Sequence, residues 1–324
     1  MSSQALGAFT TKEETCMVKC NLIIDSCCDL PPSVIAHEGV SLVKFPYVID
    51  GETIDDDLFQ SMSAADFYEG MRKGAEPTTS QPSIQILDAA FTEAAEKGVP
   101  TVYLCFTSGL SGTFDTVELV RDNVLERYPD FELYVVDTRL ASIAEGLLVY
   151  EALEQREAGL SARELVAWAE EARCFVNEQF MVDDLDALRR GGRIPSSVAL
   201  AGSALDVKPL LNIGVDGRLS LVGVARGRKK GIKQLVDFYE KNVSDSGIGR
   251  YVVVGHSDCP KDLERLKDLL LKVDDRIMFI ECNIGPVIGS HVGPDMLAVV
   301  FWGQDKRENV SVADRIARKV KGGK

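Results

Sequence analysis

Short apolar runs alternate with stretches of helical pattern through the first half of the chain, and this alternation limits the fold more than any other feature. Strand-like runs cover residues 21–24, 40–45, 102–106 and 133–136, and helices are expected at about 32–38, 113–127 and 140–157. Short buried strands that alternate with helices favour a parallel sheet covered on both faces. We therefore expect an α/β protein whose N-terminal domain is built on a parallel sheet.

The second half begins near Ser161, which with Glu164 fits the capping box of a helix start. The Asp216–Gly217 turn lies between two strand-like runs and predicts a hairpin. A hairpin that accompanies helices favours a mixed sheet in a second α/β domain. The full pattern predicts strands at 179–182, 207–213, 219–224, 251–255, 278–282 and 296–302, with helices at 183–190, 231–242 and 262–272.

The 324 residues are about twice a typical domain length, so two domains are expected. We predict an N-terminal extension at 1–20, a first domain at 21–160, a second domain at 161–303 and a helical tail at 304–324. Because no low-complexity linker separates the halves, the two domains should pack closely.

Charge and hydropathy exclude some partners. The formal net charge is −14, which disfavours nucleic acid because binding to it depends on phosphate neutralisation. No apolar run reaches the roughly 20 residues of a membrane-spanning helix. Residues 1–20 lack the apolar core of a signal peptide. The sequence thus predicts a cytoplasmic protein.

The chain has eight cysteines, including Cys16, Cys20, Cys27 and Cys28 near its start. Neither early pair has a partner with zinc-site spacing, and only three histidines are present. We expect reduced thiols, no metal and no cofactor. A redox or metal module built on these four cysteines is the alternative.

Polar clusters follow three strands of the first domain at the point where each strand ends. They are Asp25-Ser26, Thr107-Ser108 and Asp137-Thr138. In an open parallel sheet, ligands bind beyond the carboxyl ends of the strands. These clusters are therefore predicted to form a wall of the binding site.

Two hydroxyl-rich motifs, 78–83 and 108–113, precede predicted helices. In the first, Ser80 or Ser83 can serve as a helix cap, and a helix N-terminus is itself an anion site. The second departs from the Gly-x-Ser-x-Gly elbow of serine hydrolases, so Ser111 is interpreted as a hydrogen-bond donor. A Ser111-dependent acyl hydrolase with His291 as its base is the competing hypothesis.

Three further segments carry cationic or imidazole groups. Arg193 ends the basic cluster 189–193, which equally fits a helix C-terminus. His291 lies in the glycine- and proline-rich segment 285–294, which we interpret as a turn where the imidazole either reaches a ligand or serves as a structural donor. The basic run 226–230 fits an acidic partner, a lipid surface or a solvated helix start.

Taken in order, these motifs resemble those of the DegV family of bacterial fatty-acid-binding proteins, which includes the fatty-acid-binding subunits of the fatty acid kinase system. The resemblance covers about Asn21 to Trp302. It rests on Asp-Ser-x-x-Asp-Leu-Pro at 25–31, Thr-Thr-Ser-Gln-Pro-Ser at 78–83, Ser-Gly-Leu-Ser-Gly-Thr at 108–113, Val-Asp-Asp-Leu at 182–185, Arg-Gly-Gly-Arg-Ile at 190–194, Lys-Pro at 208–209, Asp-Gly at 216–217, Arg-Lys-Lys at 228–230 and Gly-Pro-Val-Ile-Gly-x-His-x-Gly-Pro at 285–294.

The resemblance implies a non-enzymatic carrier with one long-chain fatty acid in a tunnel between its domains. We expect the protein to be a monomer. It implies that Thr79 and Ser111 bind the carboxylate. Supporting polar groups are expected from Ser80, Ser108, Asp25, Ser26, Arg193 and His291. Arg226 and Arg228 correspond to residues implicated in contact with the kinase or, transiently, with a membrane surface.

In that system the bound acid is presented to a fatty acid kinase catalytic subunit, which forms an acyl phosphate for phospholipid synthesis. Two features depart from the family pattern. Cys27-Cys28 replaces a small hydroxyl or alanine pair, which alters the polar end of the pocket, and extensions precede Asn21 and follow Trp302.

Overall fold

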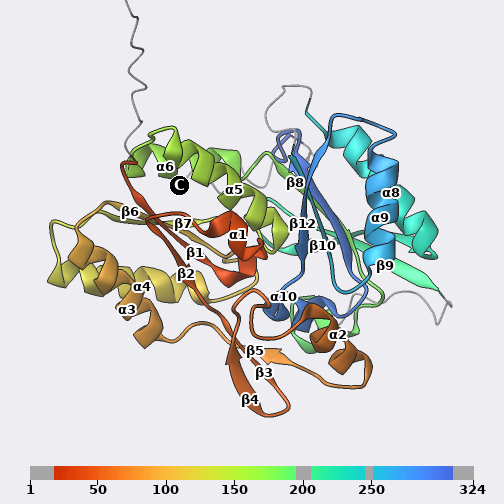
Figure 1. Ribbon diagram of the computed structural model, residues 1–324, viewed down its shortest axis with the longest axis horizontal. Helices are drawn as coiled ribbons and strands as arrows, with labels where there is room; N and C mark the ends of the chain where they lie inside the picture. Colours follow the sequence, from red (N-terminus) through yellow and green to blue (C-terminus); the bar gives the residue numbers. More distant parts are fainter. Residues whose placement is uncertain (1–17, 195–205, 245–250, 309–324) are drawn as a thin grey trace, which may run out of the picture.

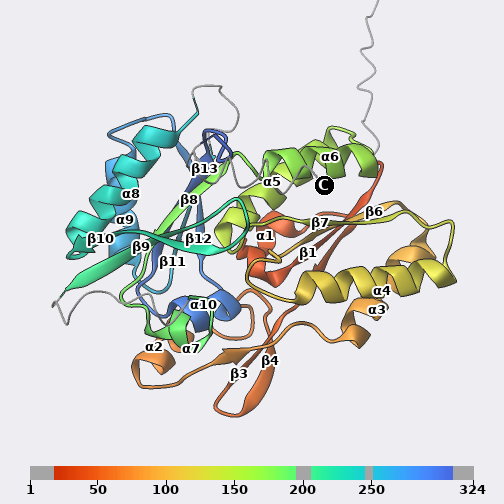
Figure 2. The same cartoon turned by 180° about the vertical axis from the view of Figure 1, so that it is seen from behind.

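The computed structural model describes residues 18–194, 206–244 and 251–308. Two sheet-based domains lie side by side, one coloured red to green and the other green to blue (Figure 1). A small third sheet lies below them, and the view from behind shows the same arrangement (Figure 2).

The first domain is built on a four-stranded parallel sheet, as predicted. Because all four strands run the same way, the residues that follow β1, β6 and β7 meet at one edge of the sheet. The strand order is β2-β1-β6-β7, with β1 at Asn21–Asp25, β2 at Val40–Val43, β6 at Thr101–Cys105 and β7 at Leu133–Asp137.

Helices cover both faces of this sheet because successive strand residues point to opposite faces. Ile23 and Tyr103 belong to the core under α3 and α4, whereas Ile24 and Leu104 belong to the core against α5. Ser161 caps α6 through the predicted capping box. The helices are α3 at Ile84–Lys97, α4 at Thr113–Arg127, α5 at Ile143–Glu157 and α6 at Ala162–Ala172.

The second domain has the predicted mixed sheet. Only the β11–β12 pair is parallel, and the hairpin around Asp216–Gly217 joins β9 to β10. The strand order is β10-β9-β8-β13-β11-β12, with β8 at Val176–Met181, β9 at Val207–Ile213, β10 at Leu219–Arg226, β11 at Tyr251–His256, β12 at Met278–Asn283 and β13 at Leu297–Trp302.

The two faces of this second sheet have different partners. Leu297, Val299 and Phe301 pack against α8 (Arg228–Asn242) and α9 (Pro260–Leu270). Met296, Ala298 and Val300 belong instead to the core shared with α5 of the first domain. The inner face of the second sheet is therefore an interdomain surface.

The sequence patterns missed a three-stranded sheet beside the first domain. The run 40–45 was predicted as one strand, but β2 ends at Val43 and a separate strand starts at Pro46. Proline lacks the N–H that a ladder needs and marks a strand start. The sheet order is β4-β3-β5, with β3 at Pro46–Ile49, β4 at Glu52–Asp55 and β5 at Thr78–Thr79, and α2 at Ala64–Arg72 follows β4.

The short elements also differ from the prediction. The expected turn around His291 is wrong: α10 spans Pro286–Val292 and places His291 in its last turn. The helix expected to reach about 38 is only α1, Pro32–Ile35, preceded by the 3-10 turn Ser26–Cys28, and α7 spans Asp186–Arg190. Residues 304–308 form bends and turns, and the rest of the predicted helical tail, like residues 1–17 of the predicted extension, lies outside the described residues.

The β9–β10 turn docks on the first domain. Thr107 Oγ1 donates to the Gly217 carbonyl at 3.0 Å, and a Cβ atom on Gly109 would lie 2.3 Å from that same oxygen. Gly109 therefore has no room for a side chain, because the backbone of the second domain approaches it closely.

Candidate functional site

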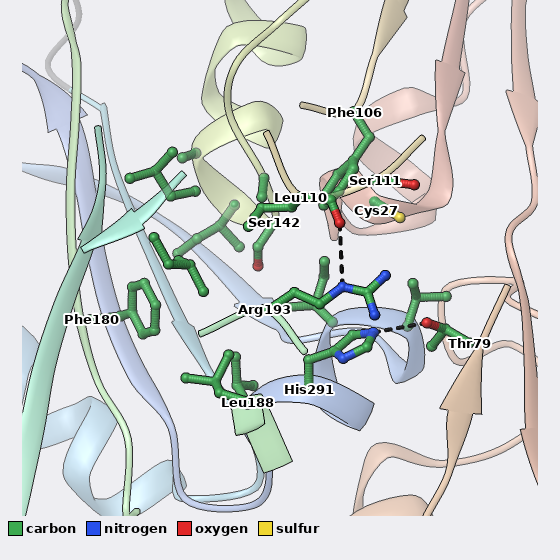
Figure 3. A pocket seen from close by; sticks show the side chains of 18 of the residues that line it. Cys27, Thr79, Phe106, Leu110, Ser111, Ser142, Phe180, Leu188, Arg193 and His291 are labelled. Carbon is green, nitrogen blue, oxygen red and sulfur yellow. Dashed lines mark hydrogen bonds between the residues drawn. The ribbon is translucent and has the colours of Figure 1, made fainter. Parts of the chain in front are cut away.

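A cavity of about 270 Å³ lies between the two domains (Figure 3). A space of roughly 10–15 Å³ holds one water-sized group, so this cavity has room for on the order of 20 such groups. Most of its wall is apolar and comes from α5, β8, β9, α10 and β13, including Ile143, Phe180, Ile213, Val287, Ala298 and Val300.

Four polar side chains from different elements meet at one end of this cavity. Thr79 comes from β5, Ser111 from the loop before α4, Arg193 from the segment after α7 and His291 from α10. Figure 3 shows them around the same space. Thr79 and Ser111, predicted as the carboxylate ligands, both line the cavity.

Thr79 and His291 form a direct hydrogen bond, with Oγ1 and Nε2 2.8 Å apart. Burial and the neighbouring Arg193 lower the pKa of His291 to about 4, so the imidazole is neutral near pH 7. In the tautomer with its proton on Nε2, His291 donates to Thr79. The Thr79 hydroxyl proton is then available to a ligand.

The backbone at Gly191 holds the imidazole from its other side. A Cβ atom at Gly191 would lie 2.2 Å from Nδ1 of His291. Nδ1 itself is buried and has no hydrogen-bond partner among the described residues. The glycine-rich segment after α7 therefore fixes His291 through close packing. The sequence pattern did not indicate this role, because the segment was interpreted from its basic residues.

Ser111 lies just before the first turn of α4. Its Oγ accepts from the Thr113 N–H at 3.2 Å and lies 2.8 Å from the Thr113 hydroxyl. Gly112, the residue at the N-cap, provides no side-chain cap. The N-terminus of this helix carries partial positive charge and free N–H groups, which favour an anion at this end of the cavity.

Arg193 bridges the two domains beside these hydroxyl groups. Its Nη1 donates to the Gly191 carbonyl at 2.6 Å, and its Nε donates to the Leu110 carbonyl at 3.3 Å (Figure 3). Burial lowers the pKa of the Arg193 guanidinium. Among the described residues, the partly buried guanidinium of Arg193 bonds to carbonyl groups and to no carboxylate, so a bound carboxylate would be stabilised here.

The other predicted polar residues lie in different positions. Ser80 lines the mouth of the cavity and is exposed. Asp25 is buried and accepts from the Cys27 and Phe106 N–H groups, and burial raises the pKa of its carboxyl to about 7. Ser26 and Ser108 do not line the cavity either. Ser26 Oγ accepts from Phe45 N–H, and Ser108 donates to Asp137 at 2.6 Å.

Several wall residues were not assigned to the site from the sequence. Cys27 was expected to alter the polar end of the pocket but was not named as a site residue, and it lines the cavity with a buried thiol whose pKa is raised by desolvation. Gln81 lines it too, and its position inside the 78–83 motif was an available signal. Glu178 lies in β8 between Asn177 and Gln179, where no local pattern connects it with a cavity.

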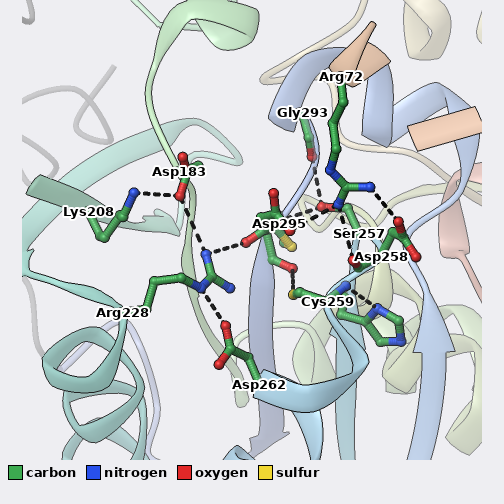
Figure 4. A network of polar contacts seen from close by, with 12 residues as sticks. Arg72, Asp183, Lys208, Arg228, Ser257, Asp258, Cys259, Asp262, Gly293 and Asp295 are labelled. Carbon is green, nitrogen blue, oxygen red and sulfur yellow. Dashed lines mark hydrogen bonds and ion pairs between the residues drawn. The ribbon is translucent and has the colours of Figure 1, made fainter. Parts of the chain in front are cut away.

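Of the two predicted contact arginines, only Arg226 is exposed. It forms no ion pair with the described residues. Arg228 is held inside a polar network (Figure 4), where its Nε donates to Asp262 and its Nη1 donates to the Asp295 carbonyl at 2.8 Å. In the same network Asp183 accepts from Lys208.

Two further findings concern metals and membranes. Within residues 18–194, 206–244 and 251–308, no three His, Cys, Asp or Glu side chains are arranged to hold a metal ion, and the seven cysteines there are free thiols. Cys16 lies outside this part of the chain. None of the described helices is both long and apolar enough to cross a membrane.

Comparison with known proteins identifies a family over nearly the whole chain. Residues 19–304 match the model of the family described as "Uncharacterised protein, DegV family". A DegV domain-containing protein of Clostridium perfringens is 37% identical over 291 residues, which are 90% of this chain and 99% of that protein.

Solved structures show the same architecture. A DegV lipid-binding protein of Thermotoga maritima is 27% identical, with a TM-score of 0.76 over 89% of this chain and 99% of that one. A DegV family protein of Thermus thermophilus, described by its fatty acid binding, is also 27% identical, with a TM-score of 0.76 over 88% of this chain and 100% of that one.

Proposed function

The chain belongs to the DegV family, and on that premise we propose that it binds one long-chain fatty acid in the interdomain cavity. The observation that carries the proposal is a mainly apolar cavity with Thr79, Ser111, Arg193 and His291 gathered at one end. Of the relatives with the same architecture, the Thermotoga maritima protein is described as lipid-binding and the Thermus thermophilus protein by its fatty acid binding, which supports the same ligand class here.

The acyl chain would supply most of the affinity. Burying about 15 methylene groups at roughly 0.8 kcal/mol each gives about 12 kcal/mol as an upper limit, because ordering of the chain opposes binding. Each hydrogen bond to the charged carboxylate adds about 1.5–3 kcal/mol. The hydroxyl groups of Thr79 and Ser111 therefore set the orientation of the acid.

The arrangement favours binding over the competing acyl hydrolase. A serine nucleophile needs a base within hydrogen-bond reach. Ser111 bonds to Thr113, whereas His291 bonds to Thr79. With its pKa lowered to about 4, His291 is also a weak base.

The test is the fatty-acid content of the protein purified from bacterial cells, measured by native mass spectrometry. We expect the wild type to retain a fatty acid, and Thr79→Ala with Ser111→Ala to weaken retention by tens of fold or more. Thr116→Ala with Ser220→Ala is the control, because both are hydroxyl residues outside the cavity. Unchanged retention in the first double variant would place the carboxylate elsewhere. Covalent labelling of Ser111 by an activated-serine probe would favour the hydrolase.

We further propose that this protein is a carrier that presents the carboxylate to a fatty acid kinase catalytic subunit. Exposed Ser80 and half-buried Ser111 place the polar end near solvent, where a partner can reach it. Exposed Arg226 offers a cationic contact for that partner or for a membrane surface.

An assay with the kinase subunit from the same organism, ATP and hydroxylamine tests this role. An acyl phosphate reacts with hydroxylamine to give a hydroxamate, so we expect hydroxamate only when both proteins are present. Formation of the same amount without the DegV-family protein would contradict the carrier role.

A further inference from the structure

The register of β8 and β13 shows which end of the cavity lies farthest from the polar groups. Met181 pairs with Leu297 at the end of the strands that lies near α7 and α10. Arg193 follows α7, and His291 belongs to α10. Along the same pair of strands, Phe180 lies opposite Ala298 and Glu178 lies opposite Val300. Two residues of a strand cover about 7 Å, so Glu178 lies a further step beyond Phe180.

Glu178 and Val300 line the cavity, whereas Val176 and Trp302, the next inward-facing pair, do not. A carboxylate therefore stands where the methyl end of a bound acyl chain would arrive. It is 5% exposed. Its Oε1 accepts from the Ile213 N–H at 2.9 Å, and its Oε2 accepts from Lys306 Nζ at 3.3 Å.

A second cavity, of about 630 Å³, lies on the other side of this ion pair. Lys306 lines it, together with polar residues such as Arg139, Arg173 and Glu170. The side chain of Lys306 is 14% exposed. The Glu178–Lys306 pair thus stands between an apolar cavity and a polar one.

We propose that the Glu178–Lys306 ion pair closes the tail end of the fatty-acid cavity and sets the longest acyl chain that it accepts. The inference rests on the proposed fatty-acid binding. A methyl group that displaced the pair would separate two buried opposite charges, which is strongly unfavourable in a low-dielectric site. Longer chains are therefore rejected at this point.

Removing the lysine stem should lengthen the preferred chain. Lys306→Ala vacates the space of about four heavy atoms, which is room for roughly three or four methylene groups. Glu178 keeps its bond to Ile213, and burial already raises the pKa of Glu178, so it can remain as a neutral carboxyl group. Each newly buried methylene should favour binding by roughly fourfold, so two should favour it by about 15-fold.

The experiment is a competition for the protein freed of lipid. An equimolar series of saturated acids from myristic to behenic is added, and bound acids are counted by native mass spectrometry. Lys267→Ala is the matched control: Lys267 is 16% exposed and ion-paired with Glu264 and Glu281, but it contacts neither Glu178 nor either cavity. Lys306→Met keeps most of the stem but removes the charge. Lys306→Ser vacates one heavy atom less than alanine and takes its place if Lys306→Ala does not fold.

We expect Lys306→Ala and Lys306→Ser to shift the bound acids by two to four carbons toward the longer members. Lys267→Ala should match the wild type, whereas Lys306→Met, which keeps most of the stem but loses the ion pair, should shift the bound acids less than Lys306→Ala does. Identical distributions in the wild type and both stem-removing variants would overturn the role of the ion pair while leaving fatty-acid binding intact. A wild type that takes up none of the acids would overturn the proposed function itself.

Discussion

Replacing Gly191 by alanine should disable the polar end of the cavity although Gly191 itself does not line the cavity. The added Cβ would lie 2.2 Å from His291 Nδ1 and 2.9 Å from its Cε1, well inside van der Waals contact. The backbone accepts alanine here, because Gly191 has φ −70° and ψ −11°, ordinary helical values. The effect is therefore steric, and the imidazole must move.

The size of the effect follows from the contacts that depend on the imidazole. Movement of His291 breaks its bond to Thr79 and releases the Thr79 hydroxyl from its orientation. Loss of one hydrogen bond to a charged carboxylate costs about 1.5–3 kcal/mol, which is about 10- to 150-fold in Kd. Overpacking in the folded protein should lower its unfolding free energy by about 1–3 kcal/mol.

The assay is a fluorescent fatty-acid displacement titration, with thermal unfolding followed in parallel. Gly192→Ala is the matched control, because Gly192 has φ +71° but nothing within 4 Å of an added Cβ. It should lose about 1 kcal/mol of stability and keep its affinity. In a His291→Ala background, Gly191→Ala should add no further loss of affinity. Wild-type affinity in Gly191→Ala, or an additive loss in the double variant, would refute the reasoning.

Three other substitutions test the structure around the cavity. Burial raises the pKa of Asp56 to about 7 from 3.8, so the folded state binds more protons than the unfolded state between those values and stability falls as pH rises through this window. Asp56→Asn should therefore flatten the pH dependence of chemical unfolding and stabilise the protein by a few kcal/mol at pH 8; an unchanged slope contradicts this. Gly109→Ala should loosen the docked β9–β10 turn, seen as faster proteolysis there together with about 1–3 kcal/mol of lost stability, and equal proteolysis would count against that contact. Arg226→Ala should leave the unfolding free energy within about 0.5 kcal/mol of wild type and keep the fatty acid, yet reduce acyl-phosphate formation by the kinase; unchanged transfer would exclude Arg226 from the partner contact.

Much of the fold was predictable because its signals are local. Apolar runs of strand length, the Ser161–Glu164 capping box and the Asp216–Gly217 turn each depend on a few neighbouring residues, and each prediction is confirmed. The three-stranded sheet was missed because β5 is only two residues long and pairs with the distant Tyr47. The helix around His291 was missed because its flanking glycines and prolines, typical of turns, here cap a helix of seven residues.

The sequence by itself determined the α/β class and the positions of the main strands along the chain, because strand periodicity is a property of neighbouring residues. Thr79 and Ser111 became candidates because their motifs resemble those of the DegV family. Only the tertiary structure decided which polar groups share the cavity. Asp25 and Ser26 bond to backbone inside the first domain, Ser108 turns to Asp137, and Glu178 reaches the far end of the cavity from another domain. Burial and contact across the domain boundary depend on how the two sheets pack, and no pattern of neighbouring residues encodes this packing.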